Sequence, residues 1–530
     1  MPDVAPPDTY DVIVVGAGSA GCALAYRLVT GTPARVLLIE AGGPDTRPEI
    51  HDEALASTMS LWAPGPMDWG YVTDPQDGLH GRTVPVARGK VWGGSSSINA
   101  MVHVRGNRRD YDRWSALGNP GWSYLDVLPY FRKLESYAGG ESEYRGGQGP
   151  VSVIRHADPT PVSERLFPAA RDVGLTDRGP DFDYNAEVQE GSPFYYQTTK
   201  TREHRRASAS VSYLYPILAA PNFSMTSNAQ VGRLLLEGTR AVGVEYLRDG
   251  RTERAMATQE VVVCAGAYES PKLLMLSGIG PAGTLRAHGI PVVADLPGVG
   301  QNLQDHMILG VAYLSRQEHP HPPTLIAETG FFTRTGVNGD AEPPDLQMKY
   351  GGLKFVSPQY DRDGPGFTFA PVLIQPRSVG YVTLRSGDPA DRAVLQPNYL
   401  ADAADVEVFL HGVEMSRVLA RSGALADFVK EEIAPGPQVT GRKELVEFVR
   451  GNAGTLWHPV GTCAMGGDRD AVVDARLKVH CVDGLRVADA SVMPRIVAGN
   501  TNAACIMIGE KAADLVRAEH AAATEARLVS

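Results

Sequence analysis

The chain has 530 residues, of which 43% are hydrophobic and 21% are charged, and its formal net charge is −11. A single hydrophobic core stops growing near about 250–300 residues, so this length predicts two intertwined domains. With a sequence pI of about 5.7, the protein is a poor candidate for nucleic-acid binding, because phosphate contacts need a basic face. An acidic balance is compatible with a cationic substrate, but it more commonly serves solubility.

The cysteines and the apolar runs indicate in which cellular compartment the protein is expected. The five cysteines are scattered without CxxC spacing, which argues against a disulfide framework or a zinc site and favours a reducing cytoplasm. We therefore expect a cytoplasmic protein that holds no metal. Residues 1–10 contain no Lys or Arg, unlike a signal peptide, and no stretch approaches the ~18–20 apolar residues of a membrane helix.

The opening of the chain predicts a βαβ unit. A β-branched strand over Asp11–Val15 leads through a glycine-rich turn into an apolar helical stretch over Cys22–Leu28. A second strand over Arg35–Ile39 follows and ends on Glu40. The change from a short strand to helical periodicity and back is typical of this unit.

Three glycines in the turn predict a dinucleotide site. In the pattern GxGxxG, Gly16 permits the tight turn, Gly18 lets the backbone approach a pyrophosphate, and Gly21 lets helix and strand pack closely. Glu40 lies at the end of the second strand, where a carboxylate can accept hydrogen bonds from ribose hydroxyls. The pattern alone does not separate FAD from NAD, and a glycine turn without a ligand is the alternative.

The middle of the chain is less regular. Short strands and loops with Gly and Pro extend from about 150 to 215, and a strand over Glu260–Cys264 runs into another glycine turn. From about 310 to 400, strands such as Phe367–Leu373 and Tyr381–Leu384 suggest an antiparallel sheet.

The C-terminal part returns to α/β character. A helical stretch covers about 403–422, a strand covers Leu485–Ala488, and a helix is expected over Ala503–Arg517. We find no internal repeat and no long linker.

Long motifs resemble those of the glucose–methanol–choline (GMC) oxidoreductases. Gly89–Asn99 looks like the first signature of this family, and Gly266–Gly280 looks like the second. The C-terminal segments that resemble its active-site region are His458–Thr462, Val487–Pro494 and Gly499–Asn502. The resemblance is in register along almost the whole chain, and by eye it is strongest to choline dehydrogenases, choline oxidases and aryl-alcohol or hydroxymethylfurfural oxidases.

The resemblance implies an α/β fold (α+β overall) with two interleaved domains. A Rossmann-like FAD-binding domain is expected from residues 1–155, 215–310 and 455–530. A substrate-binding cap with an antiparallel sheet is expected from residues 156–214 and 311–454. A homodimer is a possible assembly.

Two residues are predicted to carry the chemistry. Oxidation of an alcohol needs an acceptor for the carbon's hydride, which the flavin N5 supplies, and a base for the hydroxyl proton. Histidine suits the second task because its pKa lies near working pH. By the resemblance His458 is this base and Asn500 is its partner, which holds the substrate oxygen through its amide. Asn500 has a simpler alternative role as the cap of the following helix.

The resemblance also implies the cofactor contacts. The expected FAD-binding residues are Gly16, Gly18, Ser19, Ala20, Gly21, Glu40, Ala41, Arg88, Trp92, Gly94, Ser95, Asn99, Ala100, Val231, Asp489, Ala490, Asn502 and Ala503. Some relatives attach FAD through a histidine at the position of Ile98, and isoleucine cannot form that bond, so non-covalent FAD is expected. His103 departs from the aromatic residue or alanine usual at its place, and we interpret it as a tolerated packing change.

The predicted substrate pocket contains Ile308, Lys349, Leu456 and Trp457. Ile308 stands where choline oxidases have a glutamate for the trimethylammonium group, and Lys349 stands where relatives often have histidine. Both changes argue against choline. Lys349 would meet a carbonyl, hydroxyl or carboxylate, or else it is a solvated surface residue. Trp457 suits stacking on an aromatic substrate or packing alone.

The predicted activity is FAD-dependent oxidation of a primary alcohol to an aldehyde, with O₂ as the electron acceptor. The nearest alternative is a dehydrogenase that uses a quinone or another carrier. Hydroxynitrile lyases and a light-driven fatty-acid decarboxylase share the scaffold, so these activities are further alternatives. A flavin-binding protein without catalysis is disfavoured because His458 and Asn500 are both present.

Overall fold

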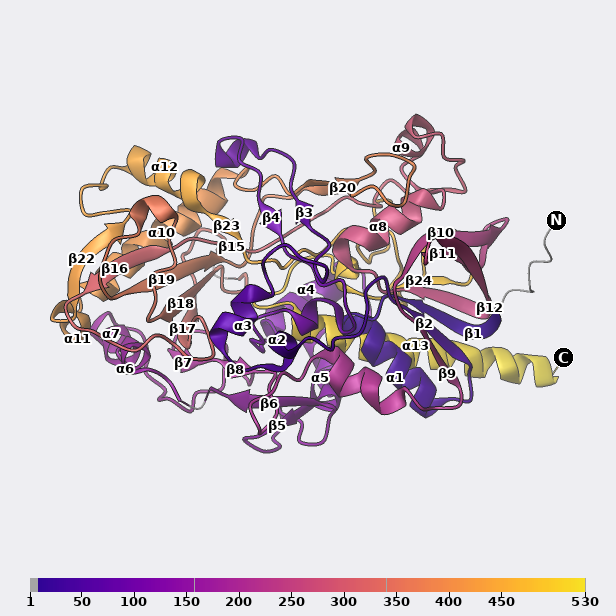
Figure 1. The fold of residues 1–530 in the computed structure, drawn as a ribbon, viewed down its shortest axis with the longest axis horizontal. Helices are drawn as coiled ribbons and strands as arrows, with labels where there is room; N and C mark the ends of the chain where they lie inside the picture. The colour runs from indigo at the N-terminus through magenta and orange to yellow at the C-terminus, as the bar shows by residue number, and fades with distance from the viewer. Residues whose placement is uncertain (1–7, 157, 340, 530) are drawn as a thin grey trace.

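A computed structural model describes residues 8–156, 158–339 and 341–529 of the chain (Figure 1). The expectation of no signal peptide concerns residues 1–10, of which residues 1–7 lie outside the described part. Within the described ranges, no helix is both long enough and apolar enough to cross a membrane.

A seven-stranded sheet forms the right-hand part of the molecule in Figure 1. Its strands are β1 (Asp8–Val15), β2 (Val36–Ile39), β9 (Phe223–Thr226), β10 (Ala229–Glu237), β11 (Arg240–Arg248), β12 (Arg251–Val263) and β24 (Leu485–Val487). The order is β10-β11-β12-β1-β2-β9, with β24 also paired to β12. The expected βαβ opening is present, and its first strand starts three residues earlier than the sequence indicated.

The centre of this sheet is parallel. β1 pairs in parallel with β12 and β2, so that Val15 lies opposite Val263 and Ile39. Val12, Ile13 and Val14 are fully buried in succession, as expected for a parallel strand that is covered on both faces. The carboxyl ends of these strands therefore meet at one edge, where ligands of such sheets bind.

An eight-stranded antiparallel sheet forms the left-hand part of the molecule (Figure 1). Its strands are β7 (Phe194–Tyr195), β15 (Met307–Ile308), β16 (Val311–Ser315), β17 (Thr329–Thr333), β18 (Leu346–Gly351), β19 (Gly366–Leu373), β22 (Val429–Ala434) and β23 (Gly454–Thr455). The main order is β22-β16-β19-β18-β17-β7, and β15 joins β19 to β23. The predicted antiparallel sheet is confirmed.

One expected strand of this sheet lies elsewhere. Residues Tyr381–Leu384 were predicted beside Phe367–Leu373, but β20 (Tyr381–Thr383) pairs only with β21 (Val394–Gln396) in a separate ribbon. Every residue of β19 is buried, and α10 (Ala403–Ala420) packs against this strand.

The remaining elements are short sheets and helices. The other paired strands are β3 (Tyr71–Val72) with β4 (Pro85–Val86), β13 (Ile279–Gly280) with β14 (Ala294–Asp295), and β5 (Glu135–Tyr137) with β6 (Val151–Arg155) and β8 (Gln197–Thr198). The other helices are α1 (Ser19–Gly31), α2 (Pro48–His51), α3 (Leu55–Ser60), α4 (Arg108–Ala116), α5 (Tyr124–Leu134), α6 (Pro161–Glu164), α7 (Leu166–Asp172), α8 (Gly266–Leu276), α9 (Ala282–Ala287), α11 (Gly423–Ala426), α12 (Arg442–Asn452) and α13 (Asn502–Val529).

Helix α13 brings the end of the chain onto its beginning. It packs along α1 (Figure 1). Gly509 permits the close approach, because a Cβ there would overlap the Ala20 carbonyl oxygen. The fully buried Glu510 carboxylate accepts from Arg27 Nε at 2.7 Å and from the Tyr213 hydroxyl at 2.8 Å. Segments from both ends of the sequence therefore build one layer.

The two sheets draw on interleaved parts of the chain. The seven-stranded sheet uses residues from 8–39, 223–263 and 485–487, while the eight-stranded sheet uses residues from 194–195, 307–434 and 454–455. The exact domain boundaries stay a prediction.

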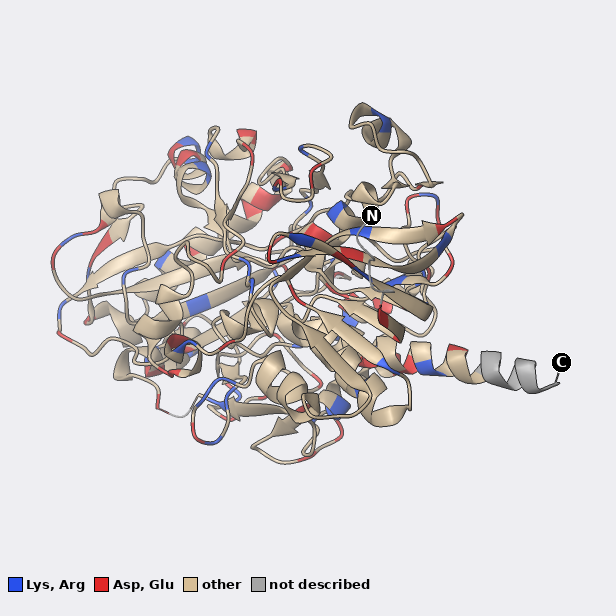
Figure 2. Ribbon diagram, turned by 45° about the vertical axis from the view of Figure 1, so that its right-hand side comes forward, with Lys and Arg blue, Asp and Glu red and all other residues tan. Residues whose placement is uncertain are grey.

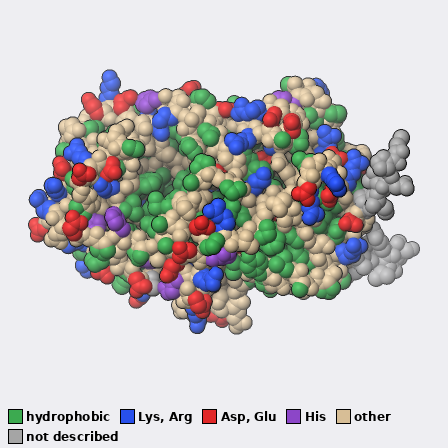
Figure 3. All heavy atoms as spheres, viewed as in Figure 1, with side chains coloured by type: hydrophobic (Ala, Val, Ile, Leu, Met, Phe, Trp, Pro, Cys, Tyr) green, Lys and Arg blue, Asp and Glu red, His purple; other side chains and the backbone are tan. Residues whose placement is uncertain are grey.

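Charged side chains of both signs alternate over the surface loops (Figure 2). On the face drawn in Figure 3, Lys and Arg are interspersed with Asp and Glu, and hydrophobic side chains gather near its middle.

Candidate active site

A cavity lies where the carboxyl ends of the parallel strands meet. Val15 and Ile39 line it, together with the glycine turn after β1 and the Cys264–Glu269 segment after β12. Gly16 has φ +103°, and a Cβ there would lie 2.5 Å from the Cys264 carbonyl oxygen. A Cβ at Gly21 would overlap the Gly16 carbonyl oxygen. These two glycines therefore serve the turn and the helix–strand packing, as the sequence predicted.

The start of α1 is free to receive an anionic group. Gly18 is its N-cap, with no side-chain cap and no acidic residue in the first turn. A Cβ at Gly18 would meet no atom within 4 Å, so its backbone borders open space. Unpaired N–H groups and the positive end of the helix dipole favour a phosphate there.

Two backbone N–H groups hold the Glu40 carboxylate in place beside the cavity. One carboxylate oxygen accepts from Ala17 N at 2.9 Å and the other from Gly42 N at 2.8 Å. Burial raises the pKa of Glu40, and these backbone N–H groups oppose that effect. The side chain is 6% exposed and lines the cavity, so its remaining lone pairs are placed for ribose hydroxyls.

A second cavity adjoins the first and leads toward the antiparallel sheet. Six residues line both cavities: Ser19, Arg88, Ser95, Pro459, Ala490 and Cys505. Such a continuous, two-part space fits a long ligand with a phosphate-bearing end at α1 and a reactive end near His458.

Most predicted cofactor residues line these cavities. In the first are Gly16, Gly18, Ser19, Ala20, Glu40, Ala41, Arg88, Gly94, Ser95, Val231, Asp489 and Ala490, and in the second are Asn99, Ala100 and Asn502. Gly21, Trp92 and Ala503 are in neither lining set. The Trp92 indole instead donates to Ser227 Oγ at 2.7 Å, so its place is beside the cavity wall.

His458 and Asn500 meet in the second cavity. The His458 Nε2 atom lies 3.1 Å from Asn500 Nδ2, and His458 Nδ1 lies 2.9 Å from His306 Nδ1. Asn500 Oδ1 is buried, and no described group bonds to it. The helix after Asn500 starts at Asn502, so Asn500 is not its N-cap, and the simpler capping role is wrong.

The hydrogen-bond chain fixes the tautomer of His458. His306 Nε2 lies 3.1 Å from the Ile374 carbonyl oxygen, which can only accept, so His306 carries its hydrogen on Nε2. Burial lowers the pKa of His306 to about 3, and the neutral ring therefore offers a lone pair on Nδ1. His458 must then donate from Nδ1, which leaves a lone pair on Nε2.

Electrostatics keep that lone pair free of a proton. Burial, and then the nearby His306, Lys349 and Arg88, lower the pKa of His458 well below its usual value. The neutral imidazole is therefore the form present at neutral pH. His458 lines the cavity, and its unprotonated Nε2 atom can accept a proton.

Asp305 and Arg88 fix the turn that carries His458. Asp305 accepts from His458 N at 2.7 Å and from the Thr455 hydroxyl at 2.5 Å. Arg88 donates to the Trp457 carbonyl oxygen at 2.8 Å. Trp457 has φ +61°, a costly conformation for a large side chain that persists only when neighbours enforce it. These contacts hold the imidazole in place.

The predicted substrate residues Ile308, Lys349, Leu456 and Trp457 all line the second cavity. Lys349 lies on β18 and is 6% exposed, so the interpretation as a solvated surface residue is wrong. The ring centroids of Trp457 and Trp62 lie 5.2 Å apart, and Trp62 also lines the cavity. An aromatic pair at this wall suits a flat substrate.

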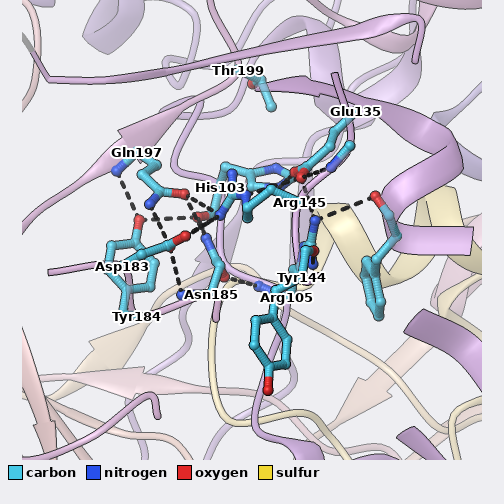
Figure 4. A network of polar contacts seen from close by, with 12 residues as sticks. His103, Arg105, Glu135, Tyr144, Arg145, Asp183, Tyr184, Asn185, Gln197 and Thr199 are labelled. Carbon is cyan, nitrogen blue, oxygen red and sulfur yellow. Dashed lines mark hydrogen bonds and ion pairs between the residues drawn. The ribbon is translucent and has the colours of Figure 1, made fainter. Parts of the chain in front are cut away.

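His103 belongs to a buried ionic cluster behind the cavity wall (Figure 4). Its Nε2 atom lies 3.3 Å from Glu135 Oε2, and Arg105 and Arg145 contact the other oxygen of the same carboxylate. All four side chains are at most 2% exposed. His103 is thus a polar partner, which corrects its interpretation as a tolerated packing change. The cluster fixes the segment that carries Met101 and Val102 into the cavity.

Sequence reasoning missed several residues of the site. No role was predicted for His306 and Asp305, although two polar residues directly before the apolar Met307–Ile308 pair were a signal of buried polar contacts. Tyr196, beside Lys349, gave no signal.

Comparison with known proteins agrees with this geometry. Residues 10–308 match the N-terminal part and residues 376–509 the C-terminal part of the GMC oxidoreductase family. The chain is 40% identical to mitochondrial choline dehydrogenase of Mus musculus, over 96% of this chain and 90% of that protein. It is 41% identical to an oxygen-dependent choline dehydrogenase of Sinorhizobium medicae, over 95% of each. Its fold resembles pyridoxine 4-oxidase from Mesorbium loti, with a TM-score of 0.88 and 33% identity over 95% of this chain and 98% of that one.

The fold and the site define a dinucleotide-dependent oxidoreductase. The chain belongs to the GMC oxidoreductase family, it is an FAD-dependent oxidoreductase, and its cofactor is FAD. The open backbone at Gly18 and the two adjoining cavities fit this cofactor.

We predict that the FAD leaves the protein on denaturation. Ile98 is 3% exposed and lines the second cavity, and its side chain has no atom that bonds to a flavin. Acid or heat should release all of the yellow cofactor into the supernatant, measured by absorbance after centrifugation. Flavin that stays with the precipitate would show attachment through another residue.

Proposed function

We propose that the protein oxidises a primary alcohol to an aldehyde and passes the electrons to O₂. The observation that carries the proposal is that His458 and Asn500 line the cavity together, with the His458 Nε2 atom 3.1 Å from Asn500 Nδ2. When bound, the flavin supplies the acceptor for the hydride of the alcohol carbon. Side chains of the protein accept the proton and orient the hydroxyl.

The substrate hydroxyl would enter between His458 and Asn500. There it donates its proton to His458 Nε2 and accepts from Asn500 Nδ2, replacing the contact between the two side chains. An alkoxide releases hydride more readily than an alcohol, so the proton acceptor lowers the barrier. His306 is a positioning residue, because it holds the His458 hydrogen on Nδ1.

Consumption of O₂ tests the acceptor. In air, the enzyme with a panel of benzylic and aliphatic primary alcohols should take up O₂ and form the aldehyde. Turnover only when a quinone or an artificial dye is added would instead support the dehydrogenase alternative.

Choline is expected to be a poor substrate. Among the described residues that line the second cavity, none is Asp or Glu, while Lys349 and Arg88 are cations. A quaternary ammonium therefore meets repulsion and no carboxylate. The measurement is kcat/KM for choline and for benzyl alcohol, and comparable values would show that the pocket has been misassigned.

The pH profile reports the state of His458. Because the lowered pKa keeps the base neutral, flavin reduction by an uncharged alcohol should be flat from about pH 6 to about pH 8 and fall only in more acidic solution. Lys349 titrates in this range, since burial lowers its pKa to about 7. The profile of Lys349→Met should have the same flat shape. A decline near pH 6.5 in both proteins would assign an ordinary histidine pKa to the base.

A further inference from the structure

Lys349 is a buried cation with few partners. Its ammonium lies 3.4 Å from the Tyr196 hydroxyl and 4.5 Å from the centroid of that ring. Gln347 Nε2 already donates to the same hydroxyl at 2.9 Å. A phenol and a ring face do not neutralise a positive charge, and no carboxylate of the described chain forms an ion pair with Lys349.

The rest of the cavity leaves this charge unbalanced. The other cation, Arg88, is turned toward backbone oxygens and donates to Ala87 O and Trp457 O, both at 2.8 Å. Within the described part of the chain, the cavity lining contains neither Asp nor Glu. A buried ammonium without a counter-ion is costly, and this cost lowers the pKa of Lys349 to about 7. A ligand that brings a negative charge would relieve that cost.

The surroundings of Lys349 also define the body of such a ligand. Apolar side chains line the same cavity as Lys349 and His458: Val102, Ile308, Ala327, Leu353, Phe355 and Ala370. Lys349 lies on β18, and β19 and β15 separate this strand from β23, which directly precedes the His458 turn. Three strand spacings of ~4.8 Å span roughly 14 Å between the backbones. Both side chains line the same cavity, so a ligand that contacts both needs an extended body between its two polar ends.

We propose that Lys349 determines the specificity of this site, and that the substrate is a primary alcohol bearing a carboxylate at the far end of an apolar or aromatic body. The inference rests on the alcohol oxidation proposed above. The carboxylate pairs with the Lys349 ammonium through charge-assisted hydrogen bonds. The apolar body lies along Ile308 and Ala370, and the hydroxyl reaches His458 and Asn500.

Three matched alcohols test the proposal: 4-(hydroxymethyl)benzoate, the uncharged 4-(hydroxymethyl)benzamide, and 4-methylbenzyl alcohol. Anaerobic flavin reduction gives the limiting rate divided by the dissociation constant for each. The parent enzyme should prefer the carboxylate over the methyl compound by about tenfold or more, and Lys349→Met should lose that preference. Equal use of the amide and the carboxylate would overturn the requirement for an anion.

Binding without turnover supplies an independent readout. Benzoate, which has no hydroxyl, should bind the parent holoenzyme in a calorimeter and bind Lys349→Met about tenfold more weakly or worse. The matched control is Lys200→Met, because Lys200 is 3% exposed but lies outside the cavity lining. It should keep both the benzoate affinity and the carboxylate preference of the parent.

The possible failures are distinguishable. Lys349 has only a structural role if the parent does not favour the carboxylate. The same conclusion follows if Lys349→Met lowers the limiting rate divided by the dissociation constant by the same factor for all three alcohols. If none of the alcohols reduces the flavin while benzoate binding still depends on Lys349, the anion site stands and the proposed oxidation of alcohols fails.

Discussion

Replacement of His458 by alanine is expected to slow flavin reduction by about 10²–10⁴-fold, the usual contribution of a positioned base. The imidazole is the proton acceptor that the hydrogen-bond chain from Ile374 through His306 prepares. Without it, the hydroxyl proton leaves to water or not at all, and the hydride must leave an alcohol instead of an alkoxide. The rate is measured anaerobically in a stopped-flow instrument with a saturating uncharged alcohol.

The rate of flavin reduction in Asn500→Ala is compared with that in His458→Ala. Asn500→Ala removes the amide that orients the hydroxyl but leaves the base, so its loss should be smaller than that of His458→Ala. The FAD content of both purified variants should equal that of the parent, because neither side chain lines the cavity at the start of α1. A larger loss in Asn500→Ala than in His458→Ala would make orientation, and not proton removal, the main contribution.

Glu135→Gln is expected to lower the free energy of unfolding by about 3–5 kcal/mol, because breaking a buried ion pair leaves uncompensated charges. The carboxylate contacts Arg105, Arg145 and His103 (Figure 4), and it also accepts from Gly146 N at 2.9 Å. Although burial raises the pKa of Glu135, the charges of Arg105 and Arg145 and the contact with His103 lower it to about 2. Glutamine keeps the shape and removes the charge.

Urea unfolding of the holoenzyme measures this effect. The matched control is Glu414→Gln, whose carboxylate pairs with Arg421 at 3.0 Å but is 62% exposed. Exposed pairs contribute about 0–1 kcal/mol, so this variant should unfold near the parent midpoint. Equal midpoints for Glu135→Gln and the parent would show that the cluster is not needed for stability.

Acid should weaken the same cluster. A carboxyl whose pKa is lowered in the folded state contributes stability that is fully present above its unfolded pKa of about 4.3 and is lost as the pH falls through the folded value. For Glu135 that folded value is about 2. The contribution of the cluster is therefore intact at neutral pH, where the oxidation is expected to run.

Local pattern was enough to predict the nucleotide-binding half of the site. The strand, turn and helix around Gly16 and Gly21 follow from β-branched residues, glycines and helical periodicity within about 30 residues. The long motif around His458 placed the base next to Asn500 across 42 positions of sequence, and the structure brings the two within 3.1 Å.

Contacts between distant strands were beyond such reasoning. Which buried face of β18 carries Lys349 depends on the register of β18 against β19, in which Lys349 lies opposite Ala370, and every residue of β18 is buried. A one-residue slip in that register would turn the side chain to the other face. His103 and Glu135 are likewise far apart in the sequence and meet only through tertiary packing, so a histidine at position 103 gave no indication of its ionic partner.

The most direct test of the account is a dark, anaerobic titration of the holoenzyme with one primary alcohol. We predict that the flavin bleaches fully without light and that one aldehyde forms for each flavin reduced. With the alcohol dideuterated at its reacting carbon, bleaching should be slower, because the C–H bond breaks as the flavin is reduced. If the flavin stays yellow in the dark with every alcohol, whether neutral or carboxylate-bearing, the protein is not an alcohol oxidase of the kind proposed here.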